Sequence, residues 1–185
     1  MRAGAHVSML RVGRTASGFF VQVEGRGTLS ESPALKEFAV QSLDPRSGPS
    51  TVVVDLSRCD YLDSTFLGCL VSLGRIYNRD SPHRFQVAAS CDKRQQLLAS
   101  THLIHVLDLT EVCPEPISDV LEMSRAIIAS ADLGQHVMEC HRHLAELGGA
   151  HATSFRSIAD QLARELGEAS GKGDPLTEKR EVPLS

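Results

Sequence analysis

Short apolar segments with the character of β-strands recur along the first two thirds of the chain. Each is rich in Val, Leu or Phe and is bounded by Gly, Ser, Asp or Pro, as strands commonly are. Thr51–Leu56 is apolar almost throughout, which is typical of a strand buried on both faces. The expected strands are Met9–Gly13, Phe19–Glu24, Thr51–Leu56, Arg84–Ala89 and Val106–Leu109.

Segments with helical spacing of apolar residues separate these strands. The expected helices run from a cap at Ser30 or Ser32 to Leu43, from Thr65 to Tyr77, and from Asp92 past Leu98. Strands that alternate with helices predict an α/β fold with a mixed, mostly parallel sheet of about five strands flanked by helices.

The C-terminal third has helical patterns only. Two prolines in Cys113-Pro-Glu-Pro116 predict a boundary, because proline ends a helix or strand that reaches it. Ile117–Ala131 is expected to be helical. Apolar stripes along Leu133–Leu147 and Phe155–Leu166, separated by Gly148-Gly149, predict a helical hairpin.

The residues after this hairpin are polar and unpatterned, which is typical of a disordered tail. We therefore expect three parts in the chain. A sheet-containing domain covers residues 1–112, a helical extension covers 113–167, and a disordered tail covers 168–185.

Composition narrows the classes of function. The chain has 185 residues, 42% of them hydrophobic, with a formal net charge of −4. This acidic balance argues against nucleic-acid and anionic-membrane surfaces, which need basic patches. No apolar run reaches the ~20 residues of a membrane span, and the first residues lack the apolar core of a signal peptide. We expect a soluble cytoplasmic protein, whose five scattered cysteines are reduced thiols.

A carboxylate and two hydroxyls, on Asp63, Ser64 and Thr65, stand at the start of the second expected helix. One interpretation is a plain helix cap, because Asp and Ser are favoured at that position. Another is a phosphorylation site, because backbone N–H groups and the helix dipole at a helix N-terminus favour an added negative charge. The residue pattern leaves both open.

A third interpretation of this stretch is enzymatic. Asp55, Asp60 and Asp63 lie near the carboxyl end of a buried strand, where open α/β sheets bind ligands, and such acids could hold Mg²⁺ for phosphoryl transfer. However, no Gly-rich phosphate loop follows them, and no Gly-x-Ser-x-Gly motif surrounds Ser64. We expect a protein without catalysis of its own, with a small phosphoryl-transfer enzyme or a purely structural interaction module as the alternatives.

Val52–Gly68 resembles the core motif of STAS domains, the anti-sigma factor antagonists. In that family, an apolar strand ending in Asp-Leu precedes Asp-Ser-Ser/Thr-Gly-Leu-Gly at the start of a helix. The resemblance covers roughly residues 8–112 and implies the STAS fold there. It also implies a bacterial signalling protein that binds an anti-sigma factor or a related kinase-like protein when unmodified. The resemblance implies no cofactor.

The resemblance assigns roles to four residues of the motif. It makes Ser64 the candidate phosphate acceptor, with Thr65 as the neighbouring alternative, and it gives Asp63 and Asp55 the role of shaping the site. The chain departs from the family pattern at Phe66, where the family has Gly. It departs again over residues 25–28, which lack the family's acidic residue, so binding without a phosphorylation switch is a second expectation.

Apolar residues surround nearly the whole helix from Thr65 to Tyr77. One face suits packing on the sheet. The other face must be covered by the helical extension or by a partner, which can be a second copy of the chain. The candidate partner-binding residues on it are Phe66, Cys69, Leu73 and Tyr77.

Histidines gather in the first helix of the expected hairpin. His136, Cys140 and His143 follow one side of that helix, with His141 and His151 near them, and such residues can bind zinc. Because Cys140 belongs to the apolar stripe and the histidines flank it, we expect packing and solvated imidazoles here, and no metal.

Overall fold

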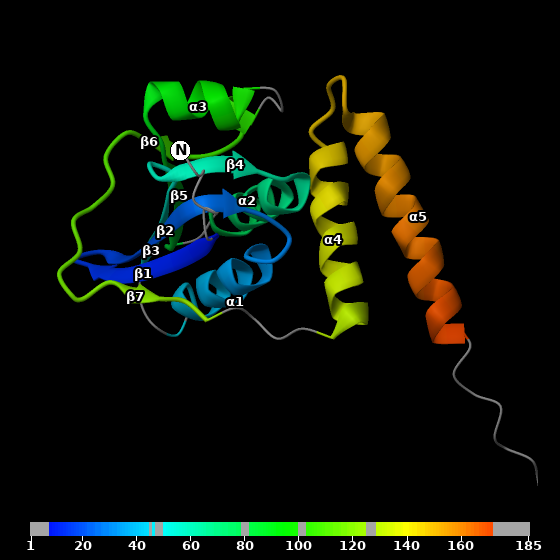
Figure 1. The fold of residues 1–185 in the computed structure, drawn as a ribbon, viewed down its shortest axis with the longest axis horizontal. Coiled ribbons are helices and arrows are strands. Elements are labelled where there is room, and N and C mark those ends of the chain that lie inside the picture. The colour runs from blue at the N-terminus through cyan, green and yellow to red at the C-terminus, as the bar shows by residue number, and fades with distance from the viewer. Residues whose placement is uncertain are drawn as a thin grey trace, which may run out of the picture.

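The computed structural model describes residues 8–44, 46, 50–78, 82–99, 103–124 and 129–171. A mostly parallel sheet is flanked by helices, and two further helices stand beside this domain (Figure 1). The predicted α/β class and the predicted C-terminal helical hairpin are both confirmed. No helix in this part of the chain is long and apolar enough to cross a membrane.

One seven-stranded sheet forms the centre of the fold, where about five strands were expected. Its order is β6-β5-β3-β2-β1-β7, and β4 pairs with β2 off this path. β1 is antiparallel to β2 and β7, whereas the other pairings are parallel. The strands are β1 Met9–Thr15, β2 Gly18–Gly27, β3 Thr51–Asp55, β4 Cys59–Leu62, β5 Arg84–Ala88, β6 Leu109–Thr110 and β7 Leu121–Glu122.

The central strand β3 is buried on both faces, as its continuous apolar run predicts. Val52 and Val54 belong to the main core, which α1 and α2 help to form. Val53 points to the other face of the sheet and packs with Phe20 and Ala88. This alternation follows from the two-residue period of a strand.

Five α-helices accompany the described part of the sheet. Figure 1 shows α4 lying between the sheet domain and α5, with α5 returning antiparallel to α4. In the loop that joins them, Gly148 and Gly149 have φ angles of 78° and 83°, which L-residues with side chains rarely adopt. The helices are α1 Ser32–Ser42, α2 Ser64–Tyr77, α3 Cys91–Leu97, α4 Ser130–Ala145 and α5 Ala152–Gly171.

The helix expected over Ile117–Ala131 is wrong for residues 117–124, whereas Ser130 and Ala131 at its end belong to α4. Leu121–Glu122 forms β7 and pairs with the outer edge of β1, while the Ile117 and Met123 N–H groups donate to carbonyls on either side of that pairing. An edge strand has unpaired backbone groups that a passing segment can satisfy, and this outweighs weak helical spacing. Residues 125–128 of the expected helix lie outside the described residues.

Two other boundaries shift. Of the expected strand Val106–Leu109, only Leu109 is in a strand, the short β6, and a 3₁₀ turn at Leu103–His105 precedes the segment. α5 continues to Gly171, into the segment expected to be a disordered tail. The rest of that expected tail, residues 172–185, lies outside the described residues.

Candidate functional site

The Asp63 carboxylate ties the start of α2 to the loop after β2. Its Oδ1 accepts a hydrogen bond from the Phe66 N–H at 2.8 Å, and its Oδ2 accepts one from the Leu29 N–H at 2.8 Å. Asp63 has the extended backbone of an N-cap residue, with φ −86° and ψ 170°. Asp63 therefore caps α2, and capping does not use the Ser64 hydroxyl.

The Ser64 hydroxyl instead contacts a histidine of α4. Ser64 Oγ lies 2.9 Å from His141 Nε2, and His141 Nδ1 lies 2.8 Å from the Val137 carbonyl oxygen. A carbonyl only accepts, so Nδ1 carries a proton, and in the tautomer with its single proton on Nδ1, Nε2 accepts from the Ser64 hydroxyl. His141 is buried and Ser64 is partly exposed, so this hydrogen bond closes one edge of the contact between α2 and α4.

The second hydroxyl of the motif is less accessible. Thr65 is buried, whereas Ser64 is partly exposed. A modifying enzyme could therefore reach Ser64 more easily than Thr65.

The Phe66 side chain, at the position where the family has Gly, lies beside Gly27. Phe66 is fully buried. A Cβ placed on Gly27 would come within 3.1 Å of the Phe66 ring and 2.6 Å of Leu62 Cδ2. The glycine at position 27 thus leaves the space that the ring fills. The sequence analysis noted Phe66 but not this contact with Gly27.

The three aspartates of the enzymatic interpretation have separate local partners. Asp55 is buried and accepts hydrogen bonds from the Ser57 N–H, the Ser57 hydroxyl and the Gln22 amide, each at 2.9 Å. Asp60 is exposed, 3.6 Å from Lys93 Nζ, and Asp63 caps α2. The described residues contain no group of three or more His, Cys, Asp or Glu side chains that could hold a metal ion, so the structure does not bring these carboxylates together.

The four candidate partner-binding side chains are buried in this structure. Phe66, Cys69 and Leu73 have no exposed area, and Tyr77 is 9% exposed. Phe66 packs beside Gly27 and Leu62, and the Cys69 thiol lies 3.5 Å from the Ser32 carbonyl oxygen at the start of α1, whereas α4 crosses α2 at Gly68. The side of α2 that α4 covers bears Ser64, Gly68 and Arg75 instead.

Polar pairs frame the contact between α4 and the sheet domain. Each joins a side chain of α1 or α2 to a histidine or a glutamate of α4. They are Ser32–His136 (2.8 Å between Oγ and Nε2), Lys36–Glu139 (3.0 Å between Nζ and Oε2), Ser64–His141 (2.9 Å) and Arg75–Glu146, where Glu146 is the C-cap of α4.

The two histidine contacts are built alike, because Ser32 and Ser64 are the first residues of α1 and α2. Burial, with a smaller contribution from Lys36, lowers the pKa of His136 from 6.5 to about 4. His136 is therefore neutral at pH 7. Sequence reasoning treated the histidines as solvated and missed Ser32. The only signal for these contacts was that the histidines flank the apolar stripe.

The remaining members of the histidine cluster point to different partners. Cys140 is buried, which raises the pKa of its thiol to about 12. Its Sγ lies 3.7 Å from His136 Nε2, but His143 Nδ1 lies 3.4 Å from the Arg75 guanidinium instead. These side chains pack and hydrogen-bond within the interface of α4.

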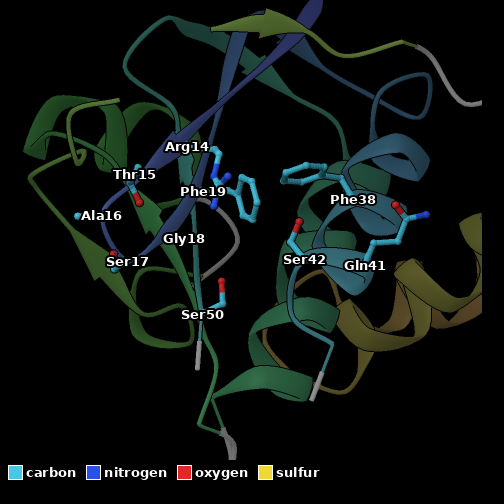
Figure 2. A pocket seen from close by; sticks show the side chains of 10 residues that line it. All are labelled: Arg14, Thr15, Ala16, Ser17, Gly18, Phe19, Phe38, Gln41, Ser42 and Ser50. Carbon is cyan, nitrogen blue, oxygen red and sulfur yellow. The ribbon is translucent and has the colours of Figure 1, made fainter. Parts of the chain in front are cut away.

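A pocket of about 500 Å³ lies elsewhere in the domain. Figure 2 shows the neighbouring rings of Phe19 and Phe38 at its lining, with Arg14 beside Phe19; the two ring centroids are 5.4 Å apart and the rings are nearly perpendicular. Its floor includes Gly18, at the first residue of β2, whereas Asp63 bonds to Gly27 at the last residue of that strand. The pocket and the Ser64 site are therefore at opposite ends of β2.

A family model described as "Mlab, STAS domain" matches residues 10–108, which is more than half of the chain. No curated protein matches the chain.

Three solved structures are similar at low identity. An anti-sigma factor antagonist from Mycobacterium paratuberculosis is 18% identical with a TM-score of 0.45, over 60% of this chain and 92% of that one. A DUF3478-family protein with a SpoIIAA-like fold from Shewanella loihica PV-4 is 12% identical with a TM-score of 0.39, over the same shares. Mglu is 21% identical with a TM-score of 0.36, over 43% of this chain but only 19% of Mglu.

Proposed function

Because the chain belongs to the STAS domain family, we propose that it is a regulatory protein of the anti-sigma factor antagonist type, which acts by binding a protein partner rather than by catalysis. The family match over residues 10–108 includes the whole Asp63-Ser64-Thr65 motif. The proposed partner is an anti-sigma factor or a related kinase-like protein in the cytoplasm. The hairpin of α4 and α5 extends this module.

The single observation that carries the proposal is the state of the Ser64 hydroxyl. It is partly exposed at the first residue of α2, and Asp63 has already taken the capping role. Modification of the Ser64 hydroxyl would therefore leave the cap of α2 in place. Backbone N–H groups and the helix dipole at this position favour an added phosphoryl group.

A phosphoryl group on Ser64 would change the surface around it. It would add a charge of ~−1.5 to −2 beside the Asp63 carboxylate, where like charges repel. It would also remove the hydroxyl proton that His141 Nε2 accepts. The effect should fall on the contacts that α2 makes with other helices more than on the sheet.

The test compares full-length chains that differ only at Ser64. A tagged wild-type chain is recovered from its native cells, and mass spectrometry identifies its partner and any phosphate on Ser64. The affinity of the purified partner is then measured by calorimetry for wild type, Ser64→Ala, Ser64→Asp and Ser64→Asn. Asn matches the size of Asp without its charge.

We expect Ser64→Asp to weaken the complex at least tenfold, which is about 1.4 kcal/mol. Ser64→Ala and Ser64→Asn should stay within a few fold of wild type, and melting curves check that every variant folds. Equal affinities for Ser64→Asp and Ser64→Asn would show that Ser64 is not a charge-dependent switch.

A further inference from the structure

The face of α1 and α2 that α4 covers is shaped to receive a helix. We propose that this face, hereafter the docking face, is an exchangeable helix-binding site: the protein's own hairpin fills it in the structure, and a helix of the protein partner fills it in the partner complex. The inference rests on the proposed function for the partner's existence. The exchange itself can be tested without that partner. The docking face is defined by Ser32, Lys36, Ser64, Gly68 and Arg75.

α2 and α4 come close together at Gly68. A Cβ built on Gly68 would lie 2.3 Å from the carbonyl oxygen of Cys140 and 2.7 Å from its Cβ. Contacts this short are not tolerated, and most of the nearby atoms are backbone that cannot rotate away. A glycine in a helix interior also lowers helix stability relative to alanine, so Gly68 needs a packing reason. Its absent side chain lets another helix cross α2 backbone to backbone.

The polar groups of the docking face specify the chemistry of the helix that fits. The face offers two cations, Lys36 and Arg75, and the hydroxyl donor of Ser64. On the side of α4, Glu139 and Glu146 pair with these cations, and His141 Nε2 contacts the Ser64 hydroxyl. We therefore infer that the partner's helix is amphipathic, with an apolar stripe that crosses Gly68, carboxylates toward the two cations, and an acceptor opposite Ser64.

The family match supports treating the hairpin as an occupant of this face rather than as part of the STAS core. The matched residues end at 108, and α4 begins at Ser130. Four polar pairs line the contact in addition to apolar packing. Interfaces between separately folded units of one chain are more polar than permanent ones, and motion between such units is the default expectation.

Ser64 sits where either helix would cross. Its hydroxyl already bonds to His141 of the chain's own hairpin. A phosphoryl group would disfavour any acceptor at that position, whether it comes from α4 or from the partner. The Ser64 switch and the exchange of helices would thus act on the same face.

The experiment measures whether the docking face binds a hairpin peptide added in solution. The probe is a fluorescent synthetic peptide of residues 130–167, and anisotropy measures its affinity for the full-length chain. Leu144 of α4 is 2% exposed and belongs to the main core. Leu144→Asp in the full-length chain places a carboxylate in that contact and expels the chain's own hairpin, while the docking face keeps its wild-type residues.

We expect the wild-type peptide to bind the Leu144→Asp chain at least tenfold more tightly than the wild-type chain, whose face is already filled. The gain should disappear when Gly68→Ala is added to that chain, and when the peptide itself carries Leu144→Asp. If Leu144→Asp does not fold, His141→Ala loosens the hairpin without a buried charge, and we expect a gain of a few fold.

Equal affinity of the peptide for wild type and for both hairpin variants would overturn the proposal. A wild-type dimer that the peptide dissociates would assign the face to a second copy and overturn the choice of occupant. If the peptide fails to displace a purified partner from the full-length chain, the partner's helix is not the occupant of this face, and the choice of occupant is wrong. Since the anisotropy assay contains no partner, its outcome is independent of the calorimetric test of Ser64.

Discussion

At the scale of single residues, Asp63 and Ser64 divide two tasks that one side chain often combines. Asp63 satisfies two backbone N–H groups, one in α2 and one in the loop after β2. Ser64 is thereby left to bond with His141 across the interface. The plain-cap interpretation of the motif holds for Asp63, whereas the switch interpretation concerns Ser64.

Asp63→Ala should lower the free energy of unfolding by about 2 kcal/mol, because it removes a helix cap and leaves the Leu29 N–H without its acceptor. Asp63→Asn keeps one side-chain oxygen and should lose less. Urea unfolding of both variants and wild type measures the difference. An unchanged midpoint for Asp63→Ala would mean that neither hydrogen bond contributes to stability.

His136 makes the stability depend on pH. Burial holds its pKa at about 4 in the fold, against 6.5 for an exposed histidine; Lys36 also lowers it, while Glu139 and Asp63 act in the opposite direction. The folded chain therefore binds this proton less readily than the unfolded chain does. The stabilisation is complete above pH 6.5 and is lost as pH falls toward 4.

Over that window, wild type should lose up to about 1.4 kcal/mol per pH unit more than His136→Gln, which cannot titrate. Urea unfolding at several pH values between 4 and 7.5 measures both slopes. Identical slopes would show that His136 protonates as easily in the fold as in the unfolded chain.

At the scale of elements, α2 is apolar on nearly every side because it is covered twice, by the sheet and by α4. The crossing with α4 depends on Gly68. Gly74 lies in the same helix, but a Cβ there would meet nothing closer than 3.8 Å. The two glycines therefore form a matched pair within one helix.

Gly74→Ala should raise the free energy of unfolding by about 0.5–1 kcal/mol, since alanine restricts the unfolded chain and favours the helix. Gly68→Ala should lower it, because the new Cβ meets the backbone of Cys140. Chemical unfolding compares the two. A stabilising Gly68→Ala would contradict the close crossing of α2 and α4.

Elements with long, regular patterns were predictable from the sequence. β3, α2 and both hairpin helices follow from continuous runs or stripes of apolar residues. β7 has two residues and exists because the edge of β1 needs partners, so no local pattern reveals it. The cover of α2 was also undetermined, because an apolar face looks the same in sequence whether a hairpin or a partner packs on it. Ser32 and His141 entered the site only through the fold.

At the scale of the whole molecule, a STAS domain carries its own helical hairpin on the face that bears Ser64. Figure 1 shows this hairpin as a layer beside the sheet domain, with α4 inward and α5 outward. The polar pairs with α1 and α2 hold α4 in register. Through the contact between Ser64 and His141, the proposed modification would act on the position of the whole hairpin of α4 and α5.

The most direct test of this account is hydrogen exchange of the full-length chain carrying Ser64→Asp, with Ser64→Asn as the uncharged control. We predict that amides of α4 exchange at least tenfold faster in Ser64→Asp than in Ser64→Asn, because the charge disfavours the contact with His141. Amides of β3 should be unaffected, since that strand lies in the core of the sheet domain. Equal protection of α4 in the two variants would contradict the claim that a charge at Ser64 weakens the hold of the docking face on α4.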